Sequence, residues 1–153
     1  MEWSTHALSG MVAGYTVTGG DWRGAVVGGI AGVLPDLDEP KSKFGKLFFF
    51  IAIPLNSIFG HRTFTHSLLF TSLAGSFIYP FTELWVALSI SAGILAHIAG
   101  DMLTGKVKFF YPSNKSVGIS VPSYTFLLID RIARIVITLY IGWEVLTKYL
   151  MTF

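Results

Sequence analysis

Long uncharged runs alternate with short polar segments along this chain of 153 residues. Runs free of Asp, Glu, Lys and Arg begin at Trp3, Thr63 and Leu84, and each reaches the roughly 17 residues that a helix needs to cross a bilayer. Two further runs, beginning at Gly24 and Leu47, are shorter. This pattern is typical of a protein with several membrane helices.

Small residues dominate the first two predicted helices, which cover about Thr5 to Gly19 and Trp22 to Leu34. Glycines recur every fourth position, at Gly10 and Gly14 and again at Gly24, Gly28 and Gly32. This spacing puts them on one face of each helix, where they allow two backbones to pack closely in lipid. The segments therefore predict a tight helical hairpin that turns at residues 19–21.

The remaining elements follow from caps, prolines and apolar runs. Pro35 and Pro40 bracket a loop, and Thr63 or Thr65 is expected to cap the next helix. The predicted elements after this loop are a helix to Thr82, a helix from Leu84 to about Asp101, a loop from Gly105 to Ser123, and a helix from Phe126 to Tyr149 in which Asp130 and Arg134 pair.

The segment from Leu47 to Gly60 decides the topology. If it crosses the bilayer, Asp36 and His61 lie on opposite sides; if it lies in the interface or re-enters, they share one side. Its short length and its Pro54 and Asn56 favour a segment that does not cross. The prediction is one all-α integral membrane domain over residues 1–153, a transmembrane bundle of about five crossings plus an interfacial or re-entrant segment.

Composition supports a membrane location and narrows the chemistry. Hydrophobic residues make up 52% of the chain and charged residues 13%, against about 25% charged in soluble domains. With the predicted topology, every basic residue except Arg23 and Lys148 shares the N-terminal side, which indicates a multi-pass cell (inner) membrane protein with this side cytoplasmic. The start Met1-Glu2-Trp3 lacks the positive charge of a signal peptide, and no small-residue cleavage site follows, so the first helix is expected to stay in the mature protein. The net charge of +2 and the scattered basic residues argue against a nucleic-acid partner.

His97 and Asp101 are the sharpest chemical signal. Four positions apart on a helix, they lie about 40° apart around its axis, so both side chains can reach one ion. The alternative is a histidine bonded to a backbone carbonyl and a carboxylate at a helix end. Because the chain has no cysteine, any bound metal must be held by nitrogen and oxygen.

Further candidate ligands lie on the same predicted membrane face. His61 and His66 can face one ion only if His61 precedes the helix, and Asp36 and Asp38 alternate in the proline-bounded loop. Taken singly, these residues and His6 are also compatible with ordinary polar groups at the interface. Together, imidazoles and carboxylates form the ligand set of zinc, manganese or iron sites, with zinc favoured and one or two ions expected.

The motifs occur in an order that resembles a known family. Thr5-His6, Leu34-Pro35-Asp36-Leu37-Asp38, His61-Arg62-x-x-Thr65-His66-Ser67 and His97-x-x-Gly100-Asp101, followed by Gly105 and Tyr111-Pro112, resemble the YdjM-like family of membrane-bound, predicted metal-dependent hydrolases. The resemblance implies a metal site at His6, Asp36, His66, His97 and Asp101, with Asp38 and His61 close by. The family is also remotely similar to zinc-dependent phospholipase C and P1-type nucleases.

These observations predict a membrane-embedded phosphoesterase that acts on a lipid or another phosphoester at the cytoplasmic face. Asp38 is the candidate general base, and Arg62 is the candidate phosphate clamp, with an interfacial anchor as its alternative role. Two other classes stay open: a non-enzymatic protein that binds or conducts metal ions or protons, and a regulatory or structural membrane partner.

Overall fold

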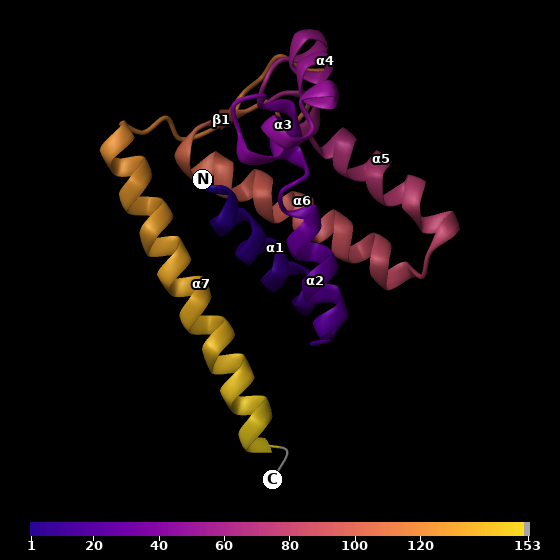
Figure 1. Cartoon of the computed structure of the whole chain (residues 1–153), viewed down its shortest axis with the longest axis vertical. Coiled ribbons are helices and arrows are strands. Elements are labelled where there is room, and N and C mark those ends of the chain that lie inside the picture. The colour runs from indigo at the N-terminus through magenta and orange to yellow at the C-terminus, as the bar shows by residue number, and fades with distance from the viewer. Residues whose placement is uncertain (152–153) are drawn as a thin grey trace.

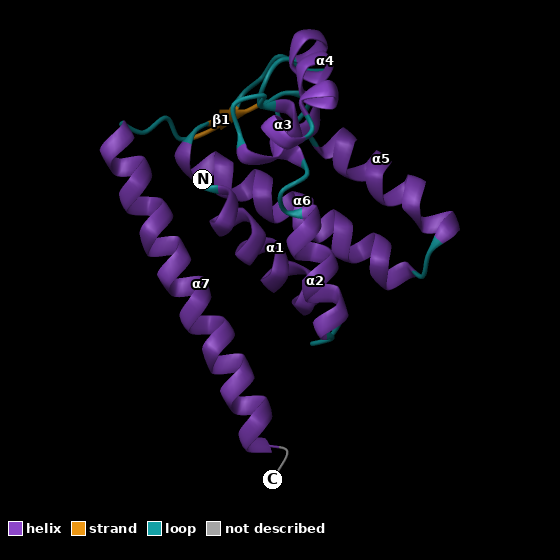
Figure 2. Ribbon diagram, in the orientation of Figure 1, coloured by secondary structure: helices purple, strands orange, loops and turns teal. Residues whose placement is uncertain are grey.

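Helices account for nearly all regular structure in the computed structural model, which describes residues 1–151 (Figures 1 and 2). The helices are α1 (Trp3–Val17), α2 (Trp22–Ala31), α3 (Lys43–Leu47), α4 (Phe49–Phe59), α5 (Leu68–Ile78), α6 (Leu84–Thr104) and α7 (Ser123–Met151). Short 3-10 turns lie at η1 (Pro35–Asp38), η2 (Phe64–His66) and η3 (Tyr79–Phe81). The all-helical class is confirmed; Thr152 and Phe153, which belong to the predicted domain, lie outside the described residues.

Helices α1, α2 and α6 pack closely because glycines face one another. The turn between α1 and α2 uses Gly19 and Gly20, both with positive φ, as the hairpin prediction requires. A Cβ atom built on Gly10 or on Gly93 would lie 2.3 Å from the carbonyl oxygen of Gly28. No side chain fits at either position, so the backbones of α1 and α6 both contact the backbone of α2 at Gly28.

The segment Leu47–Gly60 begins and ends at the same end of the helical bundle, beside the loop that contains Asp38. Helix α4 lies beside η1, and Asn56 Nδ2 donates a hydrogen bond of 2.8 Å to the carbonyl oxygen of Asp38 (Figure 1). Immediately after α4, His61 Nδ1 lies 2.6 Å from Asp38 Oδ1. The loop that holds Asp38 and the segment that holds His61 therefore share one end, which agrees with the prediction that the run between them does not cross.

The cap of α5 differs from the prediction. Neither Thr63 nor Thr65 begins the helix; Ser67 does, and its hydroxyl accepts a hydrogen bond of 3.1 Å from Phe70 N. The two threonines are used elsewhere. Thr63 Oγ1 donates to the carbonyl oxygen of Phe59, and Thr65 Oγ1 donates to the carboxylate of Asp38. The prediction was wrong because both hydroxyls find partners in the loop that precedes the helix.

Among the described helices, α6 is the one long and apolar enough to cross a membrane, with 21 residues. The apolar stretches Phe49–Phe59 and Leu68–Phe81 are shorter than a full crossing. By length and composition, then, the structure identifies one spanning helix, and the five predicted crossings stay a prediction.

The predicted loop after α6 contains a short antiparallel ladder, β1 (Lys106–Val107) paired with β2 (Val117–Gly118). It leads into α7, which leans along the bundle (Figure 1). The predicted pair on α7 is present, with Arg134 Nη2 2.6 Å from Asp130 Oδ2. Asp130 also accepts the Glu2 backbone N–H at 2.8 Å, so this pair joins α7 to the start of α1.

Candidate metal centre

All six predicted ligands meet at one end of the bundle, where the N-terminus also lies (Figure 1). Helix α1 supplies His6, and α6 supplies His97 and Asp101. The η1 turn supplies Asp36, the η2 turn supplies His66, and the turn between α4 and η2 supplies His61. Their donor atoms form three overlapping groups, each within 4.8 Å: His6, His97 and Asp101; Asp36, His66 and His97; and Asp38, His61 and His66. Tertiary packing thus places residues far apart in the sequence around one point.

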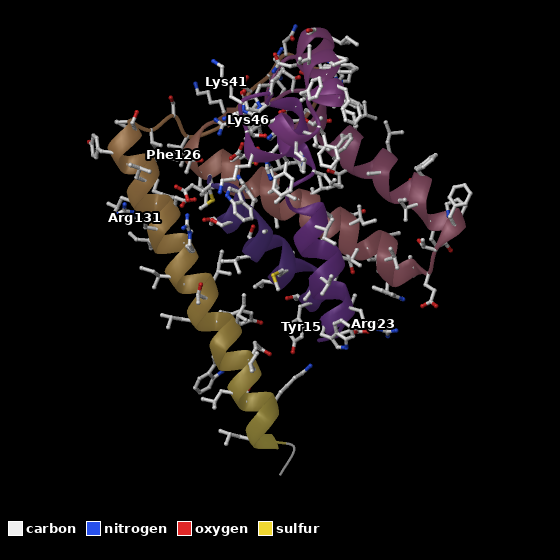
Figure 3. The ribbon with its side chains drawn as sticks, viewed as in Figure 1. Tyr15, Arg23, Lys41, Lys46, Phe126 and Arg131 are labelled. Atoms are coloured by element: carbon white, nitrogen blue, oxygen red, sulfur yellow. The ribbon has the colours of Figure 1, made fainter. Side chains whose placement is uncertain are left out.

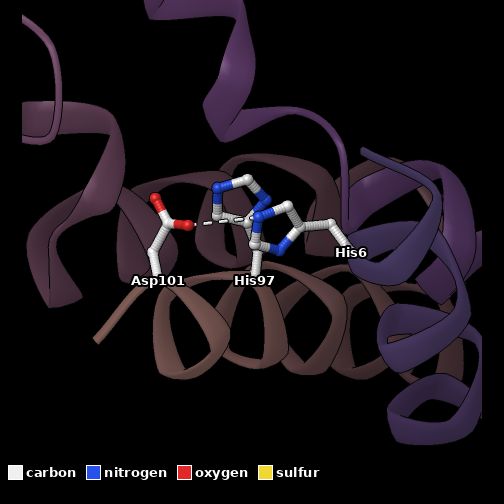
Figure 4. A group of neighbouring side chains, drawn as sticks. All are labelled: His6, His97 and Asp101. Carbon is white, nitrogen blue, oxygen red and sulfur yellow. Dashed lines mark ion pairs between the residues drawn. The ribbon is translucent and has the colours of Figure 1, made fainter. Parts of the chain in front are cut away.

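The innermost group joins α1 to α6 (Figure 4). The rings of His6 and His97 stack with their centroids 3.7 Å apart, and His6 Nε2 lies 3.2 Å from Asp101 Oδ1. All three side chains are buried, at 2% exposure or less. His97 and Asp101 point to the same side of α6, as their spacing predicts.

Hydrogen bonds fix which nitrogen of two of these histidines faces the centre. His97 Nδ1 lies 2.7 Å from the Gly32 carbonyl oxygen, which can only accept, so Nδ1 carries the proton and Nε2 is left with a lone pair. His66 Nδ1 lies 3.2 Å from a carboxylate oxygen of Asp38, which orients this ring in the same way. The two Nε2 atoms are 3.1 Å apart. Two lone pairs at this distance repel each other unless a proton or a metal ion lies between them.

The spacing of the donor atoms fits a metal ion. Bonds of 2.0–2.1 Å in a tetrahedral zinc site put neighbouring ligand atoms about 3.3 Å apart. His66 Nε2 lies 3.1 Å from His97 Nε2 and 3.4 Å from Asp101 Oδ2. The other carboxylate oxygen of Asp101, Oδ1, lies 3.2 Å from His6 Nε2. Asp36 Oδ1 is somewhat farther, 3.8 Å from His97 Nε2.

His6 gives a second sign of a missing partner. Both of its ring nitrogens are buried and make no hydrogen bond to any described residue, although Nε2 lies 3.2 Å from Asp101 Oδ1 as an ion-pair contact. Such a group costs about 1–3 kcal/mol when it is left unsatisfied. An ion held by His6 Nε2 would remove this cost, so the residues present fit a divalent metal.

Asp38 is placed to orient neighbours rather than to face a substrate. Its buried carboxylate contacts His61 Nδ1 at 2.6 Å, His66 Nδ1 at 3.2 Å, the backbone N–H of Arg62 at 3.2 Å and the hydroxyl of Thr65. Burial opposes ionisation, yet the hydrogen bonds from the two histidines outweigh it and hold the pKa of Asp38 well below its usual range. Carboxylates commonly orient metal-binding histidines in this way.

The cluster favours positive charge at its centre. Burial disfavours the imidazolium form of His66, but hydrogen bonds to Asp101 and Asp38 prevail and raise its pKa to about 9. Burial, together with the nearby charge of Asp101, raises the pKa of the Asp36 carboxyl. Without a metal, His66 therefore holds a proton between two carboxylates, and a bound metal cation would replace that proton.

Arg62 borders the centre in an unusual backbone conformation. It is the one described residue other than glycine with positive φ, at 60°, and its Nε donates to Asp101 Oδ2 at 3.0 Å. Its guanidinium lies against Gly105, where a Cβ atom would be 2.0 Å from Nη1. A cavity of about 250 Å³ opens beside it, with Arg62, His61 and Asp101 in its wall. Strained residues of this kind cluster at functional sites.

Several contacts in the site have no distinct signal in the sequence. The amino group of Met1 lies 2.6 Å from Asp101 Oδ1, and the Gly32 carbonyl orients His97. Gly105 and Thr65 both belong to the motifs that carry the family resemblance, but the sequence does not show what they do. Gly105 leaves room for the guanidinium of Arg62, and Thr65 donates to the carboxylate of Asp38.

Helices with a spanning segment, combined with a buried His and Asp centre at one end, define a helical membrane protein with a candidate metal site. The chain belongs to the YdjM inner membrane protein family, whose model matches residues 1–151.

Curated relatives agree with this family. The chain is 40% identical over 92 residues to inner membrane protein YdjM of Escherichia coli (strain K12). The matched region covers 56% of this chain and 47% of that protein. It is also 30% identical over 106 residues to the uncharacterized protein YvsG of Bacillus subtilis (strain 168), and this matched region covers 65% of this chain and 62% of that protein. The chain thus spans about half the length of the curated YdjM relative. No solved structure matches it at a significant level.

Proposed function

We propose that this chain is a metal-dependent phosphoesterase of the cell inner membrane, with its site at the cytoplasmic face. The observation that carries the proposal is the meeting of His66 Nε2 and His97 Nε2 at 3.1 Å, with both Nδ1 atoms already engaged. A proton or a metal ion has to lie between these two nitrogens. The unpartnered nitrogens of His6 and the convergent carboxylate of Asp101 favour a metal over a proton.

The proposed ligands are His6, His66, His97 and Asp101, with Asp36 as a fifth donor. Three nitrogens and one carboxylate oxygen suit zinc, and manganese and iron are the alternatives. A second ion would use His61 and Asp38, but their 2.6 Å contact already joins them as donor and acceptor. The proposal therefore places one ion at the centre and gives Asp38 the task of holding His61 and His66 in position.

The cavity beside the centre is where a phosphoester would bind. A divalent ion in such a site polarises a phosphoryl oxygen and activates water. The Nε of Arg62 donates to Asp101, which is the one hydrogen bond that this side chain makes within residues 1–151. Its Nη nitrogens can therefore donate to an acceptor in the cavity. His61 is 31% exposed, and its Nδ1 is held by Asp38, so its Nε2 can exchange a proton with a group in the cavity.

The proposed membrane arrangement places α6 across the bilayer and the metal centre near its cytoplasmic end. Arg23 lies at the far end of the bundle from Lys41 and Lys46 (Figure 3). The excess of basic residues at the metal end supports a cytoplasmic orientation of that end. Helices α1, α2, α5 and α7 are the further crossings in this proposal. Because α1, α2 and α5 are shorter than a full crossing, the bilayer would have to thin around them. The exposed apolar side chains of these helices support their contact with lipid.

Metal analysis of the purified protein tests the proposal. Wild-type protein in detergent should retain about one zinc per chain after dialysis, and chelation should lower its unfolding temperature, because an ion that binds only the folded state at 1,000 times its Kd stabilises it by about 4 kcal/mol. His97→Ala and Asp101→Asn should lose the ion and any phosphoesterase activity. Lys148→Ala, at the opposite end, is the control and should lose neither.

Two results would count against the proposal. Wild-type metal content in both site variants would mean that the ion binds elsewhere. An absence of metal from wild-type protein, together with a chelator-independent unfolding temperature, would leave the cluster as a site where His66 holds a proton.

A further inference from the structure

The cavity beside the metal centre contains a cation that the proposed chemistry does not yet use. We infer that Lys43, together with Arg62, forms a subsite for the terminal phosphate of a membrane lipid, an inference that rests on the proposed function. Lys43 lies in the first turn of α3 and in the cavity wall.

Lys43 is held in place without an acidic partner. Its Nζ lies 4.8 Å from the ring centroid of Trp3, and Trp3 is itself packed edge-on against Phe44 at 5.9 Å. No carboxylate within the described part of the chain forms an ion pair with Lys43, whereas Asp36 and Asp101 in the same wall each face histidines. A tryptophan face orients an ammonium but does not neutralise it, so its charge stays available to a ligand.

The cavity wall contains both acidic and basic groups. Asp36 and Asp101 belong to the metal centre, and a divalent ion there would cancel their repulsion toward an anion. The cations in the wall are Lys43, the guanidinium of Arg62 and the Met1 amino group, and the last of these is paired with Asp101. Glu39 also lines the cavity, but one carboxylate oxygen accepts the Lys41 N–H at 3.0 Å and the other lies 3.9 Å from His61 Nε2. An anionic group in the cavity would therefore meet the metal ion as well as Lys43 and Arg62.

The cavity volume limits what can enter. About 250 Å³ is below the usual 300–1,000 Å³ of sites that enclose a whole drug-sized ligand. A phosphate with its ester linkage fits in such a space, whereas a whole nucleotide or a whole phospholipid does not. The substrate therefore has a small phosphorylated end, and the rest of the molecule stays outside the cavity.

The surroundings of the cavity point to a lipid as the source of this phosphate. The segment that follows Lys43 exposes a row of large apolar side chains, at Leu47, Phe49, Phe50, Ile53 and Ile58. Lys41 and Lys46 flank it on the same end of the molecule (Figure 3). Apolar side chains next to lysines are typical of segments that lie in the interface of an anionic bilayer, where lipid headgroups are found.

The first test uses inorganic phosphate as the probe and zinc-loaded, full-length protein in detergent. Phosphate should raise the unfolding temperature of wild-type protein, and Lys43→Ala should need about ten times more phosphate for the same shift. Lys43→Arg should restore most of the response. Lys46→Ala removes the same charge from the same short helix but not from the cavity, so it should behave as wild type.

The second test separates a lipid from a soluble source. In mixed micelles, wild-type protein should release phosphate from phosphatidic acid with a kcat/KM at least about ten times that for glycerol 3-phosphate, which has the same phosphate without the acyl chains. Lys43→Ala should raise KM for phosphatidic acid more than it lowers kcat.

The outcomes distinguish this inference from the proposed function. Equal phosphate responses of Lys43→Ala and Lys46→Ala, in protein that binds zinc, would overturn the subsite alone. Equal turnover of glycerol 3-phosphate and phosphatidic acid would overturn the lipid assignment alone. Wild-type protein that binds no zinc and hydrolyses neither compound would overturn the proposed function as well.

Discussion

Replacing Gly105 by alanine should displace Arg62 and leave the rest of the molecule unchanged. Gly105 has φ of −174°, an extended conformation that alanine adopts without strain, so the effect depends only on space. The added Cβ would lie 2.0 Å from Arg62 Nη1 and 3.0 Å from Cζ. The backbone N and O of Arg62 are bonded to Asp38 and Lys108, so the side chain has to move.

The magnitude follows from these distances. Ordinary non-bonded contact requires the guanidinium to move by about 1 Å or more, which is enough to break its 3.0 Å contact with Asp101, and misplacement on this scale can lower a rate by about 10²-fold. Stability should change little. Losing a partly exposed ion pair lowers the free energy of unfolding by about 0–1 kcal/mol. Replacing glycine by alanine reduces the conformational entropy of the unfolded chain, which raises the free energy of unfolding by about 0.4–1 kcal/mol and offsets this loss.

The assay compares three properties of the same preparation: zinc content, unfolding temperature and kcat/KM for a phosphoester. Gly105→Ala should keep the first two and lose most of the third. Gly142→Ala is the matched control, because no atom lies within 4 Å of the Cβ it would add. Equal activity of the two variants would refute the placement of Arg62 by Gly105, and loss of zinc from Gly105→Ala would show that this glycine acts on the metal centre instead.

Two further predictions concern packing and topology. A Cβ atom added at Gly14 would lie 2.0 Å from the carbonyl oxygen of Gly24 and force α1 and α2 apart. In denaturant titrations, Gly14→Ala should therefore lower the free energy of unfolding by about 1–3 kcal/mol relative to Gly142→Ala. An unchanged midpoint of unfolding would contradict this close contact. In intact cells, an impermeant thiol reagent should label an introduced Thr82→Cys but not Lys46→Cys, and the reverse result would invert the proposed orientation.

Local patterns in the sequence determined the parts of this protein that depend on few residues. Helix geometry alone places His97 and Asp101 on one side of α6, and the repeated glycines are sufficient to predict a tight α1–α2 hairpin, because four-residue spacing acts within a single helix. The apolar runs likewise predicted α1, α2, α6 and α7, with ends accurate to within about three residues. They did not predict the short helix α3, which lies in a segment read as loop, and they placed the ends of α5 too far out. These features require no knowledge of which segments meet.

Only the tertiary structure decided how the separate motifs act together. The sequence marks Asp38 as a carboxylate, but its role depends on His61, His66 and Thr65, which reach it because α4 turns the chain back to η1. Contacts over such distances depend on the packing of whole helices, which no single motif encodes. The same holds for Ser67, which caps α5 because the loop engages the threonines before it, and for Gly105, whose missing side chain has meaning only beside Arg62.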